Sequence, residues 1–189
     1  MIVEIGHYAL VLALVLAIVQ TVVPFVGVKS GDERQIAMAP NLAFAVFAAI
    51  ALSFAVLTWG YVTSDFSILN VWENSNSQQP LLFKFTGVWG NHEGSMLLWV
   101  LILALFGALV GLFGTNLPPT LRAMAISVQG LIGVAFLGFI LFTSNPFERL
   151  SPAPLEGQDL NPILQDIGLA IHPPLLYLGY VGFSISFSF

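Results

Sequence analysis

The sequence predicts an all-α integral membrane protein with about five transmembrane helices and two longer outer loops. Hydrophobic residues make up 57% of its 189 residues and charged residues only 8%, whereas charged residues alone are about 25% of a typical soluble protein. The charges gather in short clusters and leave five uncharged runs, each long enough for the roughly 20 helical residues that cross a hydrocarbon layer of about 30 Å. The lipid bilayer is therefore the first predicted partner.

The five runs set the bounds of the predicted spans within a single membrane domain, residues 1–189. A cleaved signal is disfavoured for the first run, because Glu4 makes its start acidic and no A-x-A site follows. The sequence stops at Phe189 without a charge that would anchor the last span, which predicts a fragment of a larger polytopic protein. The spans are expected at about residues 8–28, 40–63, 94–113, 123–146 and 173–189, and the outer loops at 64–93 and 147–172.

Basic residues in the loops predict the orientation, because Lys and Arg are enriched on the cytoplasmic side. The two short turns hold Lys29, Arg34 and Arg122, whereas the two much longer loops hold only Lys84 and Arg149. The N-terminus and both long loops are therefore expected outside. There is no basic patch for nucleic acid, and the absence of cysteine excludes a disulfide and a nucleophilic thiol of the chain's own.

The first two spans are apolar helices without a charge inside the membrane. His7 and Tyr8 open the first span and are interpreted as an interfacial polar residue beside an aromatic anchor. Proton pumps and ion-coupled transporters usually place Asp, Glu or Lys within their spans. A membrane transporter or respiratory-complex subunit is therefore an alternative with less support, and a purely structural anchor is a third.

The first long loop ends in a polar and aromatic cluster that leads into the third span. Asn91 is the predicted N-cap, and on a helix that starts there His92 and Ser95 share one face with Met96 and Trp99. A zinc hydrolase of the H-E-x-x-H type is disfavoured, because Met96 stands where the second histidine would be. The cluster either seats the helix end or contacts a cofactor or substrate. The candidate contacts are Trp89, His92, Glu93, Ser95 and Trp99.

The third and fourth spans carry signals of close helix packing. The third contains Gly107-x-x-x-Gly111, a spacing of small residues that lets helices approach. A short turn with Pro118 and Pro119 leads into the fourth span, which is also dotted with glycine. These features predict helix contacts and no chemistry.

The second long loop, acidic and rich in proline, delivers the chain to His172-Pro173-Pro174. Proline fixes its own φ and disfavours the α region for the residue before it. His172 is therefore predicted to be the extended N-cap of a helix that begins at Pro173. The partial positive charge of a helix N-terminus favours the neutral, metal-competent imidazole. His172 is the candidate metal ligand and the two prolines position it; the alternative is that it only caps the helix.

Four stretches together resemble one known family. They resemble the N-terminal part of the large haem-lyase subunit of bacterial cytochrome c maturation, the CcmF family, with its nitrite-reductase-associated paralogue NrfE. The stretches are Glu4-Ile-Gly-His-Tyr-Ala-Leu, Asn74-Ser-Asn76, Trp89-Gly-Asn-His-Glu-Gly-Ser95 with Trp99, and Leu169-Ala-Ile-His-Pro-Pro-Leu-Leu-Tyr-Leu-Gly-Tyr180.

The resemblance implies a function and a location. It implies a haem-handling subunit of the bacterial inner membrane, with a periplasmic N-terminus, that positions haem for thioether attachment to Cys-x-x-Cys-His of apocytochrome c. The implied cofactor is b-type haem, to be attached as c-type, and the implied partners are a haem-carrying chaperone, apocytochrome c and other cytochrome c maturation subunits. The family's periplasmic axial ligand, a histidine followed by Pro-Pro, maps onto His172.

The resemblance also limits what this segment does alone. Family members are several times longer and carry a tryptophan-rich WWD segment, a second axial histidine and further haem ligands. Haem lyase activity therefore belongs to the complex, and the segment alone is expected to be inactive. No catalytic residue is predicted here, because the substrate's own thiols add to the haem vinyl groups and the protein need only position them.

Overall fold

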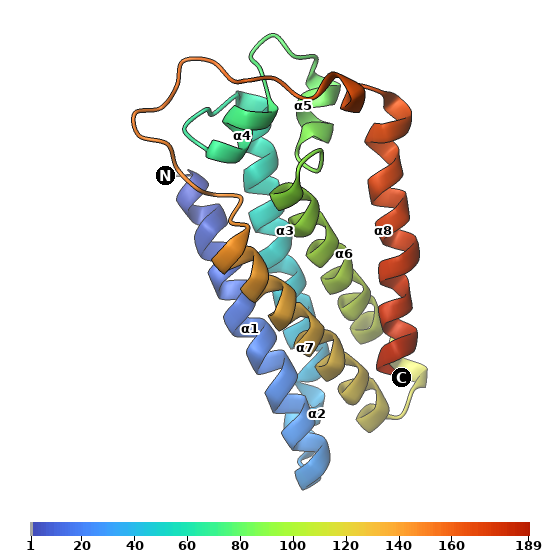
Figure 1. The fold of residues 1–189 in the computed structure, drawn as a ribbon. Coiled ribbons are helices and arrows are strands. Elements are labelled where there is room, and N and C mark those ends of the chain that lie inside the picture. Colours follow the sequence, from blue (N-terminus) through green and yellow to red (C-terminus); the bar gives the residue numbers. More distant parts are fainter. Residues whose placement is uncertain (1) are drawn as a thin grey trace.

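The computed structural model describes residues 2–189 as a bundle of long helices with the loops gathered at its two ends (Figure 1). Among these residues there is no β-strand, and five helical segments are long and apolar enough to cross a membrane when α2 and α3 count as one. The predicted fold class is confirmed. The helices are α1 (Ile2–Ser30), α2 (Glu33–Ala37), α3 (Ala39–Thr63), α4 (Leu69–Asn74), α5 (Leu81–Gly87), α6 (His92–Phe113), α7 (Pro119–Thr143) and α8 (Ile167–Ser188).

Helices α1, α3, α6 and α7 form the packed core. Helix α1 lies along both α3 and α7, and α3 lies along α6. Small residues such as Ala13 and Ala17 are fully buried on α1 and let the helices approach. The polar side chain of Gln20 is buried as well, and its amide donates to the Ile126 carbonyl of α7 at 2.9 Å. This bond satisfies a polar group that would be costly in an apolar interior.

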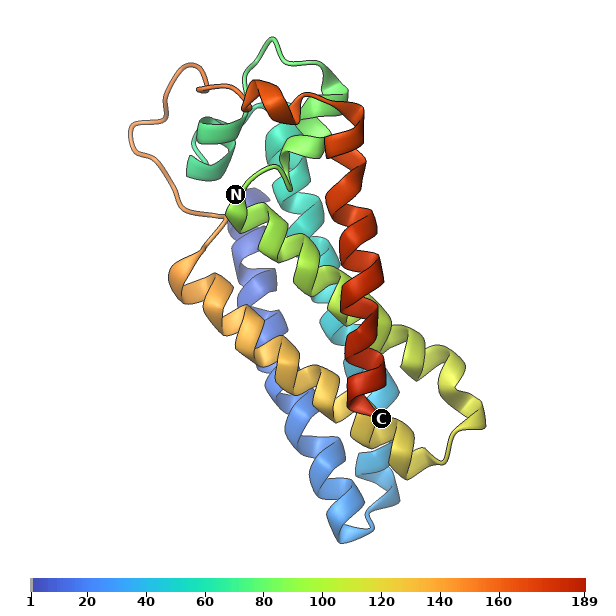
Figure 2. The same ribbon diagram turned by 45° about the vertical axis from the view of Figure 1, so that its right-hand side comes forward.

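Helix α8 is peripheral. Of its residues only Ala170 and Val181 are buried, and it contacts mainly α6 and α7. Figure 2 shows α8 and α7 close together near the C-terminus and separating toward the opposite end. At the close end the Gln129 amide of α7 donates to the Ser188 hydroxyl at 2.7 Å. Side-chain hydrogen bonds therefore join α8 to the bundle in addition to its apolar contacts.

The two long loops pack on each other at one end of the bundle, which we call the loop end: residues 64–91 and 144–166 (Figure 1). The Gln158 N–H donates to the Trp72 carbonyl at 2.7 Å. The Ser77 hydroxyl and N–H donate to the Glu156 carboxylate at 2.5 and 2.9 Å, and these bonds hold the pKa of Glu156 below its usual value. The first loop is not structureless, because α4 and α5 form within it.

The start of the last long helix was predicted wrongly. Helix α8 begins at Ile167 and not at Pro173, so His172 is not an N-cap. Asp166 is the cap: its carboxylate accepts the Leu169 N–H at 3.1 Å, and its carbonyl accepts the Ala170 N–H at 2.8 Å. A good capping residue six positions upstream starts the helix early, and the helix then continues through both prolines. Helix α7 ends at Thr143, whereas the fourth span was predicted to run to residue 146.

Candidate functional site

His172 lies in the second turn of α8, at the loop end, with its side chain exposed. Within residues 2–189 its ring takes part in no hydrogen bond, ion pair or ring contact. The influence of a helix dipole falls off after the first turn, and His172 does not lie at a helix N-terminus as the sequence predicted. The availability of the ring nitrogens for a ligand rests on their freedom from protein partners.

Three of the predicted contact residues reach α8 from α6 and the turn before it. The indole N–H of Trp89 donates to the Ala170 carbonyl at 2.8 Å, and the indole N–H of Trp99 donates to the Tyr180 hydroxyl at 2.5 Å. The Ser95 hydroxyl hydrogen-bonds the Tyr177 hydroxyl between them. Three hydrogen bonds, spaced along α8, therefore connect this cluster to the helix that carries His172.

The two tyrosines of α8 were not among the predicted site residues. Tyr177 and Tyr180 stand three residues apart, so they lie on one side of a helix. A buried or half-buried tyrosine hydroxyl usually has a hydrogen-bond partner. Ser95 and Trp99 stand four residues apart on α6, so one can pair with each tyrosine. That matched spacing is the signal in the sequence that could have identified the pair.

His92 and Glu93 point away from α8. The His92 ring nitrogen Nε2 lies 3.1 Å from the Ser144 hydroxyl, and its ring meets the edge of Phe139 on α7 at 6.2 Å between centroids. The Glu93 carboxylate accepts from the Asn70 amide at 3.2 Å. Both residues thus have protein partners that seat the start of α6. Their contact with haem or substrate stays a prediction.

A buried polar network holds the turn before α6. Asn91 is the N-cap as predicted, and its side-chain oxygen accepts the Gly94 N–H at 2.8 Å. Its amide nitrogen donates to the hydroxyl of fully buried Tyr61 at 2.8 Å, and Tyr61 donates to the Asn70 side-chain oxygen at 2.7 Å. Asn91 bonds to α6 and to Tyr61 of α3, and Tyr61 in turn bonds to Asn70 of α4. The network therefore fixes the start of α6 relative to α3 and α4.

Between α6 and α7 the surface is hollowed into an apolar pocket of about 270 Å³. Met96 lines it from α6, and Phe136 and Phe139 line it from α7. Trp99 lies beside it, with its ring centroid 3.9 Å from that of Phe136. The predicted shared face of His92, Ser95, Met96 and Trp99 is divided between two helices. His92 and Met96 lie against α7, Ser95 bonds to α8, and Trp99 contacts both.

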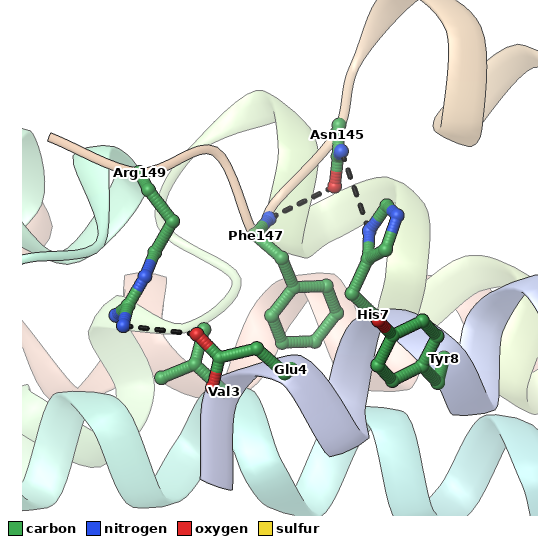
Figure 3. Close-up of a pocket in the computed structure, with 7 residues that line it drawn as sticks. All are labelled: Val3, Glu4, His7, Tyr8, Asn145, Phe147 and Arg149. Carbon is green, nitrogen blue, oxygen red and sulfur yellow. Dashed lines mark hydrogen bonds and ion pairs between the residues drawn. The ribbon is translucent and has the colours of Figure 1, made fainter. Parts of the chain in front are cut away.

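A second pocket, of about 250 Å³, joins the start of α1 to the segment after α7 (Figure 3). The Arg149 guanidinium lies 3.0 Å from the Glu4 carboxylate, and the Asn145 amide lies 3.4 Å from the His7 ring nitrogen Nδ1. A Cβ at Gly6 would lie 2.6 Å from the Phe147 ring, which explains the glycine of the opening motif. The ionic groups of this pocket pair with each other, so we assign the motif to loop attachment.

His172 is the described residue that would hold a haem iron. Within residues 2–189 no group of three or more His, Asp or Glu side chains is placed to hold a metal ion. Haem iron is bound by four porphyrin nitrogens and needs only one imidazole from this chain. The exposed ring of His172, without a protein partner, meets that requirement.

Comparisons with known proteins show which family this chain resembles. The sequence pattern of the family described as "Cytochrome C assembly protein" matches residues 89–189, which contain both α6 and α8. The chain is 66% identical to the cytochrome c-type biogenesis protein CycK of Rhizobium meliloti over 100% of its length and 28% of that protein. It is 46% identical to CcmF of Escherichia coli over 98% of its length and 29% of that protein.

A solved structure supports the fold. The chain superimposes on the cytochrome c haem lyase CcmF with a TM-score of 0.86 and 28% sequence identity, over 100% of this chain and 29% of that one. The chain therefore spans less than a third of the length of the relatives it matches. The resemblance noted in the sequence is confirmed, and the chain belongs to the cytochrome C assembly protein family.

Proposed function

We propose that this chain is the haem-handling part of a c-type cytochrome biogenesis protein and that His172 binds the iron of the substrate haem. The observation that carries the proposal is the exposed, unpartnered imidazole on a helix that three side chains of α6 and its preceding turn hold in place. A ligand held on an anchored helix loses little freedom on binding. The names of the relatives, which include biogenesis proteins and a haem lyase, point to the same chemistry.

The chain's own role in this chemistry is to bind and orient. When haem is present, it supplies an iron for His172 and the vinyl groups across which the two apocytochrome thiols add. This chain has no cysteine and so forms no adduct of its own. The partners that fit are a haem-carrying chaperone, apocytochrome c and other maturation subunits. Pro173 and Pro174 limit the backbone freedom beside the ligand.

A chimaera tests the function directly. Residues 1–189 replace the matching part of the Rhizobium meliloti CycK protein, and the chimaera is expressed in a strain that lacks CycK. We expect holocytochrome c, detected by haem staining, at a level close to that with CycK itself, because 66% of the positions are identical. A chimaera that accumulates in the membrane without restoring holocytochrome c would contradict the proposal.

We further propose that the loop end faces the periplasm and that the N-terminus lies there as well. In the chimaera, cysteine introduced at Ser77 or Gln158 is expected to react with an impermeant thiol reagent added to whole cells. Cysteine at Asp32 or Asn116, at the opposite end of the bundle, should react only after the cells are broken. The motivation is the charge distribution, with Lys29, Arg34 and Arg122 confined to the short turns. Labelling of position 77 only in broken cells would show that the loop end faces the cytoplasm, contrary to the proposal.

A further inference from the structure

The second proline of α8 leaves a carbonyl without its helical donor. In an α-helix the carbonyl of residue 170 accepts from the N–H of residue 174, and Pro174 has none. Ala170 is only 5% exposed, so water has little access to it. Leu169, which Pro173 deprives in the same way, is 41% exposed, and water can serve its carbonyl. Of the two carbonyls, that of Ala170 is the one that needs a donor from the protein.

Trp89 provides that donor. Its indole N–H reaches the Ala170 carbonyl at 2.8 Å from a position 81 residues earlier in the chain. The indole is itself held on two sides: it stacks on Phe54 of α3, with 6.5 Å between centroids and 15° between planes, and meets Phe85 of α5 edge-on at 5.3 Å. These two contacts already hold the indole in place. The hydrogen bond therefore restrains the first turns of α8, which have few other contacts.

Few other contacts restrain this turn. On either side of Ala170, the side chains of Ile167 and Ile171 are 60% and 51% exposed. The hydrogen bonds of α8 to Ser95 and Trp99 come about two and three turns after Ala170, at Tyr177 and Tyr180. The Asp166 cap belongs to the helix itself and does not tie it to the core. The Trp89 bond is therefore the polar anchor nearest to His172.

We propose that Trp89 is a positioning residue for His172: its indole N–H replaces the donor that Pro174 lacks and so sets the place of the turn that presents the imidazole. The inference rests on the proposed function only in taking His172 as the haem ligand. It changes the role of Trp89 from the predicted haem or substrate contact to an internal hydrogen bond. It also explains why the chain carries Trp89 and Pro174 together.

The test is a rescue experiment in the purified chimaera. Trp89→Phe keeps a ring on Phe54 and removes the N–H, and we expect amide hydrogen exchange in residues 167–172 to become about tenfold faster, as for loss of one buried hydrogen bond. The low-spin haem signal in electron paramagnetic resonance should broaden, because the ring is held in more than one orientation. Adding Pro174→Ala restores a backbone N–H for Ala170 and should reverse both effects.

A matched control separates this role from general support of α8. Trp99→Phe also removes an indole N–H that α8 uses, at Tyr180, but Pro174→Ala cannot replace that bond. Rescue of Trp89→Phe without rescue of Trp99→Phe supports the proposal. Unchanged exchange in Trp89→Phe, or faster exchange with an unchanged haem signal, overturns it. The proposed function is tested separately with a His172 variant. If its haem signal equals that of the unaltered chimaera, His172 is not the haem ligand, whatever the role of Trp89.

Discussion

Replacing His172 with glycine in the chimaera is expected to lower haem occupancy about tenfold or more. Loss of groups that only support a metal ligand already costs about 10- to 100-fold in affinity, and this change removes the proposed ligand itself. Occupancy is measured from the haem absorbance per mole of purified protein, and holocytochrome c is measured in the same cells. Added imidazole is expected to restore part of both, because it can fill the position that the side chain vacates.

Two controls make the His172 result specific. Glycine inside a helix costs about 1 kcal/mol relative to alanine, so His172→Ala tests whether the loss follows the imidazole and not the helix. His7→Ala removes another histidine of the loop end, which lies against Asn145 and Phe147, and should leave haem occupancy unchanged. Normal haem spectra and cytochrome yield in His172→Gly, at normal protein levels, would rule out His172 as the ligand.

Replacing Gly94 with alanine is expected to cause the largest loss of stability. A Cβ at this position would lie 1.6 Å from the Val88 carbonyl oxygen and 2.8 Å from its carbon. No rotation relieves a contact with the backbone, so the turn between α5 and α6 has to open. The cost is expected to be about 3 kcal/mol or more, at the upper end for overpacking. The same turn carries Trp89 and the Asn91 cap, so haem occupancy should fall with it.

The Gly94 result is measured as the amount of chimaera in the membrane and as its unfolding temperature in detergent. Gly133→Ala is the matched control, because it is also helical but has no atom within 4 Å of the added Cβ. Alanine is the better helix former by about 1 kcal/mol, so this variant should be at least as stable as the original. Equal unfolding temperatures for Gly94→Ala and the unaltered chimaera would show that the turn tolerates the side chain.

The sequence by itself determined the class of the protein and most of its helices. Five apolar runs without charges have one stable arrangement in lipid, because only helices satisfy their own backbone groups there. Composition and run length are local properties, so no knowledge of packing is needed to interpret them. The same holds for the Asn91 cap, which depends on a side chain and the N–H of Gly94 only three residues away.

Only the tertiary structure decided how the His-Pro-Pro segment folds. The local rule that the residue before proline avoids the helix predicted an extended His172, yet α8 runs through both prolines from the Asp166 cap. The donor that makes this tolerable comes from Trp89, on a distant segment. In the same way, Trp89, His92, Glu93, Ser95 and Trp99 look like one cluster in the sequence, but three of them serve α8 and two face elsewhere. Hydrogen bonds between distant segments depend on how the helices pack, and a local sequence pattern does not contain that information.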